Sequence, residues 1–404
     1  MVTECSHFNI SSAVKNTKMG NSNQKPATTS AASSPTTLAT PSIDVATTPL
    51  LVHVPLSLEN ADASEMQQLA DDVCVALRAR VAGYDDINVD DLVLTHLTGA
   101  MTNVIFTCHK KSAPEDRVLL RLYGAGTEAF FSRQEEILVF KELSLLNLGI
   151  GLVGEFQNGR FERMIEGRTC TAEDIRRPEL SEMIAAKMAV FHTTQVDMDR
   201  KPRILASISK LFKDAQAAYA TTHRQFPDVD AMAADIAALE ALLATVDSPV
   251  VFCHNDLQYG NIMLSTGTGQ DKDGEDAVLI DFEYSHYNPR GYDIGNHFTE
   301  WCYNYHGDAP HLGDFAKYPT AADQRRFCRA YLSSQSATCD DVADAHVDQL
   351  RHEANVYANA THLFWALWGF IQATQSTIDF DYFGYATCRW HAFKTRVTLS
   401  SDVK

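Results

Sequence analysis

The segment Phe252–Ile262 reads FCHNDLQYGNI and is followed, after a polar turn, by Val278–Glu283, which reads VLIDFE. The first segment carries Asp256 and, five residues later, Asn261, and the second places Asp281 directly after an apolar run. An Asp, an Asn and a second Asp in this order can activate a hydroxyl group and hold Mg²⁺ on the phosphates of a nucleotide. The spacing therefore predicts phosphoryl transfer, with Asp256 as proton acceptor and with Asn261 and Asp281 as metal ligands.

A simpler interpretation exists for the first segment, because Asp and Asn are common turn residues. The apolar run before Asp281 and its distance from Asp256 favour the phosphoryl-transfer interpretation. His254 precedes the loop on the strand side, so we expect it to form structural hydrogen bonds and not to act as a base. The run Gly124–Ala129 matches a dinucleotide-binding pattern, but the alternating strands and helices of such a site are missing around it.

Composition and charge restrict the class of protein. A length of 404 residues exceeds the usual size of a single core and favours two lobes. The formal net charge of -18, without clustered Lys and Arg, argues against a nucleic-acid partner and suits a cationic substrate. Nine cysteines without a CxxC pair disfavour a disulfide framework. We also see no apolar stretch of membrane-spanning length and no signal peptide, so we expect a soluble cytoplasmic protein without membrane insertion.

The chain is expected to have three parts. Residues 1–55 are rich in Ser, Thr, Ala and Pro and predict a disordered tail. Residues 56–165 predict a small β-rich lobe that binds a nucleotide, and residues 166–404 predict a large helical lobe with the catalytic loop and the substrate pocket. The expected elements are a helix around Leu69–Leu77, strands at 92–94, 103–108, 118–123, 156 and 161–165, helices at 135–146 and 180–191, and further helices from Ala321 onward. The predicted fold class is α+β.

Arg121 lies in an apolar run, Val118–Tyr123, where a charge that faced a core would be costly without a partner. We expect it to contact nucleotide phosphates and to be steadied by Glu136, with Glu135 as the competing partner. An arginine that simply faces solvent from an edge strand is the alternative.

Aromatic residues form a second group of candidate site residues. Trp365 and Trp368 are three apart in a helical run and therefore share one face. Trp301, Tyr303, Tyr305, Tyr382 and Tyr385 lie elsewhere in the same half of the chain, and the first three follow Glu300 closely. Ring faces near a carboxylate can hold a quaternary ammonium group, which has no N–H to donate. Ordinary core packing of these rings is the alternative.

With these residues in view, the chain resembles the choline/ethanolamine kinase family from about Leu92 to Arg396. The resemblance rests on Leu120–Gly124, His254–Asn261, Ile280–Tyr284 and above all Arg290–Phe298, which reads RGYDIGNHF. It implies a two-lobed protein-kinase-like fold, ATP and Mg²⁺ as cofactors, and phosphorylation of choline or ethanolamine at the start of phospholipid head-group synthesis. A homodimer is compatible with it.

The resemblance also implies roles for individual residues. On the nucleotide it places Gly99, Thr102, Asn103, Arg121, Glu136, Arg163 and Ile165, the last two through their backbone at the adenine. In the substrate pocket it places Gln258 near the hydroxyl group, and Glu300, Tyr305, Trp365, Trp368 and Tyr385 around the cation. Ala100 and Pro289 depart from the family pattern.

Within the family the motifs point both ways: Glu300-Trp301 and Gln258–Gly260 resemble choline kinases, whereas Ser376–Asp381 and Gly384–Ala386 resemble ethanolamine kinases. We expect a dual choline/ethanolamine kinase that prefers choline. Two other classes of protein are alternatives. An aminoglycoside phosphotransferase-like kinase of the same fold should lack the Arg290–Phe298 run and the paired Trp. A catalytically inactive scaffold should have lost Arg121, Asp256, Asn261 or Asp281, and all four are present.

Overall fold

The computed structural model of the protein describes residues 50–55, 58, 61–97, 103–123, 133–222, 226–266, 275–335 and 342–401. The predicted tail up to residue 49 lies outside them. Two compact units are formed, one by the chain up to Thr127 together with Leu152–Met164, the other by Glu128–Gly151 together with Ile165–Lys404. The three-part division predicted from the sequence stays a prediction, although Val52 is already buried in the core of the first unit, before the expected end of the tail.

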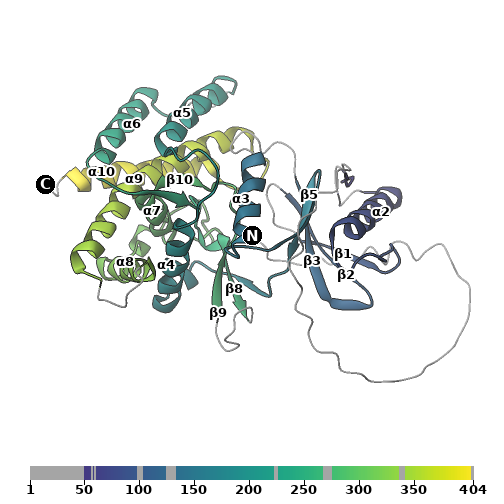
Figure 1. The fold of residues 1–404 in the computed structure, drawn as a ribbon. Helices are drawn as coiled ribbons and strands as arrows, with labels where there is room; N and C mark the ends of the chain where they lie inside the picture. Colours follow the sequence, from purple (N-terminus) through teal and green to yellow (C-terminus); the bar gives the residue numbers. More distant parts are fainter. Residues whose placement is uncertain are drawn as a thin grey trace, which may run out of the picture. The chain divides into compact units, whose positions relative to one another are not determined.

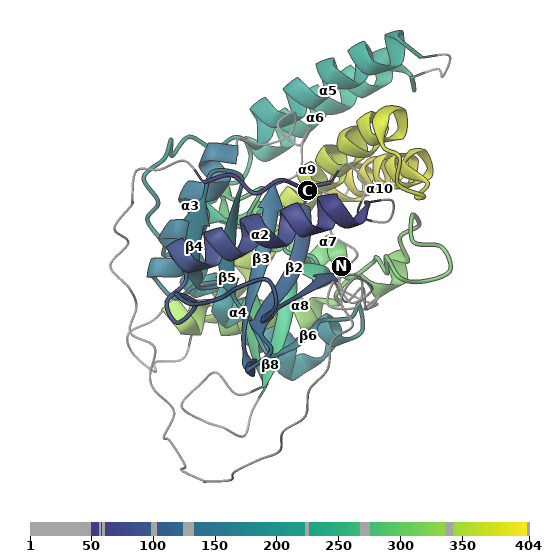
Figure 2. The same cartoon turned by 90° about the vertical axis from the view of Figure 1, so that its right-hand side faces the viewer.

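The first unit is built on an antiparallel sheet with the strand order β1-β2-β3-β5-β4. Its strands are β1 Leu92–Leu97, β2 Asn103–Lys110, β3 Ala113–Tyr123, β4 Leu152–Phe156 and β5 Gly159–Arg163. Helix α2, Ala63–Arg80, lies across one face of this sheet (Figures 1 and 2). A capping box of Asp62 and Glu65 starts the helix, and Leu69, Val73 and Leu77 enter the core. The predicted strands are present and several are longer than expected, although the strand expected at 161–165 begins at Gly159 and ends at Arg163.

The second unit is mainly helical. Its helices are α3 Arg133–Leu145, α4 Pro178–His192, α5 Ile204–Ala220, α6 Val229–Leu243, α7 Arg290–Glu300, α8 Ala321–Gln335, α9 Asp344–Gln375 and α10 Tyr382–Ser401, with 3₁₀ turns η3 Asp174–Arg176, η4 Tyr259–Asn261 and η5 Phe315–Lys317. Helix α9 is the central element, because α5, α7, α8 and α10 all pack on it. Helices α5 and α6 form a hairpin at the outside of this unit (Figures 1 and 2).

Two small sheets interrupt the helices around the segment Phe252–Glu283. Strand β7, Val250–Cys253, pairs antiparallel with β10, His286–Pro289. Strands β6, Gly167–Thr169, β8, Ile262–Thr266, and β9, Glu275–Leu279, form the other sheet in the order β6-β8-β9. The loop with Asp256 therefore runs from one small sheet to the other.

Helix α7 corrects one prediction, since the helices resume at Arg290 and not at Ala321. Two glycines lower the helix propensity of this segment and hide it from a pattern search. The structure explains the glycine at position 295. A Cβ atom there would lie 2.6 Å from the backbone oxygen of Ala354 and 2.8 Å from the backbone nitrogen of Ala358. Gly295 thus allows the close approach of α7 to α9.

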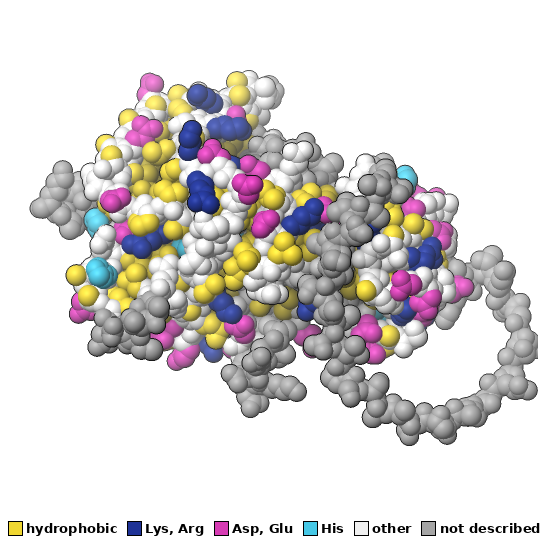
Figure 3. Space-filling view, in the orientation of Figure 1, with side chains coloured by type: hydrophobic (Ala, Val, Ile, Leu, Met, Phe, Trp, Pro, Cys, Tyr) yellow, Lys and Arg dark blue, Asp and Glu magenta, His cyan; other side chains and the backbone are white. Residues whose placement is uncertain are grey.

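The described surface carries mixed charges. On the face in Figure 3, Lys and Arg side chains lie singly or in small groups among acidic, polar and hydrophobic side chains. Among the helices within the described ranges, none combines the length and the apolar character that crossing a membrane requires.

Candidate active site

Residues 254–261 form the loop between β7 and η4–β8 and carry most of the predicted catalytic residues. Asn255 has a positive φ of 65°, a left-handed conformation that Asn tolerates better than most residues. The backbone N–H groups of His254 and Asn255 donate to the two carboxylate oxygens of Asp293 in α7, at 2.8 and 2.7 Å. Because Asp293 is fully buried, it holds the backbone directly before Asp256 in place.

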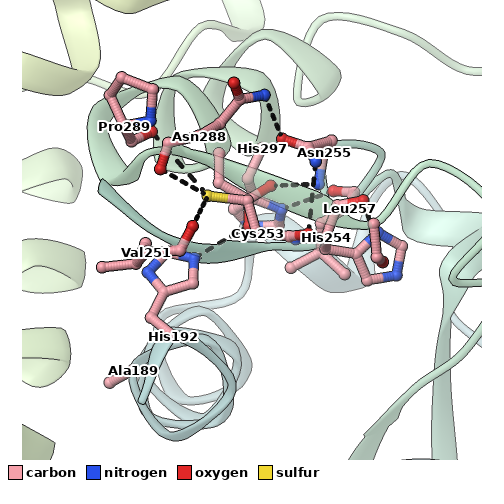
Figure 4. A network of polar contacts seen from close by, with 12 residues as sticks. Ala189, His192, Val251, Cys253, His254, Asn255, Leu257, Asn288, Pro289 and His297 are labelled. Atoms are coloured by element: carbon pink, nitrogen blue, oxygen red, sulfur yellow. Dashed lines mark hydrogen bonds and ion pairs between the residues drawn. The ribbon is translucent and has the colours of Figure 1, made fainter. Parts of the chain in front are cut away.

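A buried polar network supports the 254–261 loop from behind (Figure 4). The Asn288 side chain in β10 donates to the side-chain oxygen of Asn255 at 2.9 Å, and the Cys253 thiol lies 3.4 Å from the Asn288 carbonyl oxygen. His192 of α4 reaches the network with its Nε2, 2.9 Å from Asp293 Oδ2. His192, Cys253 and Asp293 are residue types that also bind metals, but here hydrogen bonds already occupy them. The network is therefore a structural support.

His254, in the loop, and His297, in α7, are neutral structural supports. Burial lowers the pKa of His254, whose Nε2–H donates to the carbonyl oxygen of Ile280 at 2.9 Å. Burial lowers the pKa of His297 in α7 to about 4, and its Nδ1–H donates to the carbonyl oxygen of Leu257 at 2.9 Å. The structural role expected for His254 agrees with these contacts.

Asp256, Asn261 and Asp281 are brought together by the 254–261 loop and by the pairing of β8 with β9. The amide nitrogen of Asn261 donates to the main-chain oxygen of Asp256 at 2.8 Å and to its carboxylate at 3.0 Å. The N–H of Ile280 donates to the carbonyl oxygen of Asn261 at 3.0 Å. Asp281 follows directly, with a positive φ of 65° and an exposed side chain. The three residues predicted to perform the chemistry thus lie at one place.

The oxygen donors at this place fit a Mg²⁺ ion. Because the amide nitrogen of Asn261 faces Asp256, its amide oxygen faces the opposite side, where Gln258 Nε2 lies 3.5 Å away. The Asp281 carboxylate makes no hydrogen bond or ion pair with any residue that the structure describes. Hard oxygen ligands with positions left for water and phosphate are what Mg²⁺ prefers.

The environment of Asp256 favours proton uptake. Burial raises the pKa of its carboxyl group well above the usual value, and the charges of Glu300 and Asp281 raise it further. The hydrogen bond from Asn261 and the charge of Arg389 act in the opposite direction. A carboxylate with a raised pKa is a stronger base, which suits a proton acceptor.

The predicted pocket residues Tyr305, Trp365, Trp368 and Tyr385 lie in one aromatic cluster of the second unit. The ring centres of Trp365 and Trp368 are 5.5 Å apart, those of Trp368 and Tyr385 6.3 Å, and those of Tyr305 and Tyr385 6.4 Å. Most of these rings meet edge to face. The structure therefore gathers side chains from α9, α10 and the segment after α7.

The two tryptophans have different environments within this aromatic cluster. Trp365 is buried, and its indole N–H donates to the side-chain oxygen of Asn296 in α7 at 2.8 Å. Trp368 is partly exposed and lies on the wall of a cavity of about 330 Å³. The wall of this cavity also includes Tyr284 and the acidic residue Glu283, but not Asp256. Trp365 thus belongs to the core as much as to the pocket, whereas Trp368 faces open space.

The side chains of Glu300 and Trp301 contact different parts of the second unit, although the two residues are neighbours in sequence. Glu300 is buried at the end of α7, and one of its carboxylate oxygens accepts from the Tyr305 hydroxyl at 2.8 Å. The indole of Trp301 instead points to His297, with 3.5 Å between Nε1 and Nε2. Trp301 is not a member of the aromatic cluster, so its proximity in sequence was misleading.

Three residues of the site were missed by the sequence reasoning. Asp293 lies in the Arg290–Phe298 run, and its carboxylate between Tyr292 and Ile294 is the only local signal. Tyr284 directly follows the second acidic motif, and its ring lies 5.4 Å from that of Trp365. Arg389 lies in α10, fully buried against Glu300, and no feature of its local sequence indicates this.

Arg121 of β3 has a buried partner that the sequence did not suggest. Its Nε donates to Glu162 of β5 at 2.7 Å, and Arg160 shares the same carboxylate oxygen at 2.8 Å. The competing partner Glu135 forms two hydrogen bonds with Arg203, at 2.8 and 2.9 Å. Arg121 and Glu136 belong to different units, so their pairing stays a prediction.

The remaining predicted nucleotide contacts lie at the edges of the described chain. Asn103 opens β2 and Arg163 closes β5, both in the first unit, while Ile165 begins the second of the two chain segments that form the second unit. Gly99, Thr102 and the departure at Ala100 lie outside the described residues. Their roles remain predictions.

Comparisons with known proteins agree with this geometry. Residues 94–394 match the family model described as choline/ethanolamine kinase. The chain is 35% identical over 348 residues to probable choline kinase 2 of Arabidopsis thaliana, covering 84% of this chain and 97% of the relative. It is 35% identical over 321 residues to the human choline/ethanolamine kinase, covering 76% of this chain and 80% of the relative.

Solved structures support the fold. A choline kinase from Cryptosporidium parvum superposes with a TM-score of 0.72 at 22% identity, covering 82% of this chain and 96% of that chain. The predicted two-lobed protein-kinase-like fold of class α+β is therefore confirmed. With a family model that matches most of its length and relatives at this level of identity, the chain belongs to the choline/ethanolamine kinase family.

Proposed function

We propose that the protein is an ATP-dependent choline kinase that also accepts ethanolamine, and that it transfers the γ-phosphoryl group of MgATP to the hydroxyl group of the amino alcohol in phospholipid head-group synthesis. One observation carries the proposal. Helix α7 holds the backbone beside Asp256 through Asp293 and ends at Glu300, among the rings of the aromatic cluster. A base for a hydroxyl group and a pocket for a cation thus share one rigid support.

Asp256 accepts the proton of the substrate hydroxyl as its oxygen attacks the γ-phosphorus, and ADP leaves. Gln258 contacts this hydroxyl group in the proposed complex, and the Gly260 N–H, which donates to its side-chain oxygen at 2.7 Å, helps to fix its side chain. Asn261 and Asp281 would hold Mg²⁺, which would neutralise charge on the phosphates. Arg121 and Asn103 bind the phosphates from the first unit, and the backbone of Arg163 and Ile165 binds the adenine.

The cation of the substrate is held by ring faces of the aromatic cluster, above all by Trp368. A trimethylammonium group gains about 0.5–2 kcal/mol from each desolvated contact with a ring face. This gain explains why we expect choline to be preferred. We also propose a cytoplasmic location, because every cysteine that the structure describes is a free thiol.

A coupled ADP-release assay tests the function with choline, ethanolamine and an aminoglycoside as acceptors and Asp256→Asn as the inactive reference. We expect turnover with choline, weaker turnover with ethanolamine and none with the aminoglycoside. Turnover with the aminoglycoside alone would assign the protein to the antibiotic-kinase alternative. Absence of ADP release with every acceptor, in a folded protein that binds MgATP, would favour the inactive scaffold.

A further inference from the structure

Arg389 is a buried charge that the proposed chemistry does not use. Its side chain is completely enclosed, in helix α10, although it carries the same sign of charge as the substrate cation. A buried guanidinium group is costly unless it is paired and hydrogen-bonded. Its partners therefore indicate what it does.

The partners of Arg389 are Glu300 and the phenols of the aromatic cluster. Nη2 donates to one carboxylate oxygen of Glu300 and, at 3.3 Å, to the Tyr305 hydroxyl. Nε donates to the Tyr385 hydroxyl at 3.1 Å. The guanidinium carbon lies 3.8 Å from the ring centre of Tyr303 and 5.1 Å from that of Tyr385. One side chain thus contacts three aromatic residues and the carboxylate beside them.

These contacts decide what Glu300 can offer to a substrate. One of its oxygens is bonded by Arg389 and the other by the Tyr305 hydroxyl at 2.8 Å. The negative charge of Glu300 is thereby neutralised within the protein. A primary ammonium group such as that of ethanolamine would have to compete with Arg389 for this carboxylate, whereas a quaternary ammonium group needs ring faces only.

We propose that Arg389 is a positioning residue that determines substrate specificity. It holds Glu300 in an internal ion pair and supports the rings of Tyr303 and Tyr385. The pocket therefore recognises the substrate cation by ring faces and not by a hydrogen bond to Glu300. This inference rests on the proposed function. It assigns Glu300, which the resemblance places around the cation, to the internal ion pair with Arg389.

The first test is Arg389→Lys, which keeps the charge but loses the planar, multiply hydrogen-bonded fork. We expect KM for choline to rise roughly 10-fold and the ratio of kcat/KM for choline to that for ethanolamine to fall about 5-fold or more, because weaker ring support harms choline while a looser Glu300 helps ethanolamine. KM for MgATP should stay unchanged. An unaltered choline-to-ethanolamine ratio would overturn the inference.

Arg290→Lys is the matched control. Arg290 also forms two hydrogen bonds with a buried glutamate, Glu353, both at 2.8 Å, but it lies at the other end of α7, about 15 Å along the helix from Glu300. We expect this variant to lower the melting temperature and to leave the substrate ratio at the wild-type value. A shift in the ratio equal to that of Arg389→Lys would show that general damage explains both, and would reject the inference.

A second variant decides the question if Arg389→Lys does not fold. Glu300→Gln keeps the shape of the side chain and leaves the charge of Arg389 uncompensated. The uncompensated guanidinium group would repel both substrate cations, so the inference predicts equal losses of kcat/KM for choline and ethanolamine. A loss confined to ethanolamine would mean that Glu300 bonds this substrate directly and would refute the inference. If wild-type protein phosphorylates neither amino alcohol, the proposed function fails, an outcome distinct from an unchanged ratio in an active enzyme.

Discussion

The 254–261 loop and the aromatic cluster are assembled in opposite ways. The loop holds Asp256 and Asn261 within one short segment, and a single strand pairing adds Asp281. The cluster takes its rings from α9, α10 and the segments after β9 and α7, which are far apart in the chain. Catalytic groups can thus be close neighbours in sequence, whereas a pocket that encloses a cation needs walls from several elements.

Helix α7 connects the two regions. Asp293, in its first turns, holds the 254–261 loop, Asn296 in its middle holds Trp365, and Glu300 at its end joins Arg389. These side chains are all buried. The comparison therefore predicts that some changes affect one region only, and that a change in the packing of α7 affects both.

The largest effect is expected for Asp256→Asn, which should disable the chemistry and spare the pocket. It keeps size and hydrogen bonding but removes the proton acceptor, so kcat should fall by roughly 10²-fold or more. Affinity for MgATP and for choline, measured by calorimetry, should barely change. Near-normal turnover would mean that another group accepts the proton.

Asp281→Ala should also act on the loop region alone, with a loss of similar or slightly smaller size. Removing the carboxylate deletes a proposed Mg²⁺ ligand, so turnover and MgATP affinity should both decline and excess Mg²⁺ should restore part of each. Titration of Mg²⁺ at fixed ATP measures this rescue. Wild-type MgATP affinity together with wild-type turnover would contradict the ligand role.

Gly295→Ala should affect both the 254–261 loop and the aromatic cluster. The added Cβ would meet the α9 backbone at 2.6 Å, and backbone cannot move away cheaply, so we expect a loss of about 1–3 kcal/mol in the free energy of unfolding. Because α7 serves both regions, kcat and KM for choline should change together. Chemical denaturation measures the free energy of unfolding, and steady-state kinetics measures kcat and KM. An unfolding curve identical to that of the wild type would disprove the packing argument.

Trp368→Ala should affect the cluster alone and choline more than ethanolamine. We expect kcat/KM for choline to fall roughly 10-fold beyond the loss for ethanolamine, about 1.4 kcal/mol of transition-state binding, with a small change in melting temperature. Trp365→Ala is the comparison, because this ring is buried and should cost about 3–5 kcal/mol of stability with both substrates depressed. Equal stability losses for the two variants would mean that both rings are simply core.

The smallest effect is expected from a change that touches neither region. Deleting residues 2–48 should leave activity and melting temperature unchanged, since this segment has few large apolar residues. Extending the deletion through residue 54 should destabilise the first unit, because it removes the buried Val52 and its two hydrogen bonds with Asn158, at 3.0 and 2.7 Å. Thermal melts of both truncations separate these expectations.

The sequence was most informative where neighbouring residues constrain one another. Short apolar runs located β2, β3 and β5. It was least informative at α7, whose glycines look like helix breakers until α9 is placed against them. The partner of Arg121 was missed for a similar reason, because Glu162 lies 41 residues away and reaches it only through strand pairing.

The reaction class and the family could be inferred from the sequence alone, because Asp256, Asn261 and Asp281 stand in a short, ordered pattern and the run Arg290–Phe298 is specific. Which rings form the cluster and which groups Glu300 bonds depend on the tertiary structure. Arg389 and Glu300 are 89 residues apart and meet because α7 and α10 both pack on α9. No local rule links such residues, since the free energy that brings them together comes from burying whole helices and not from their own side chains.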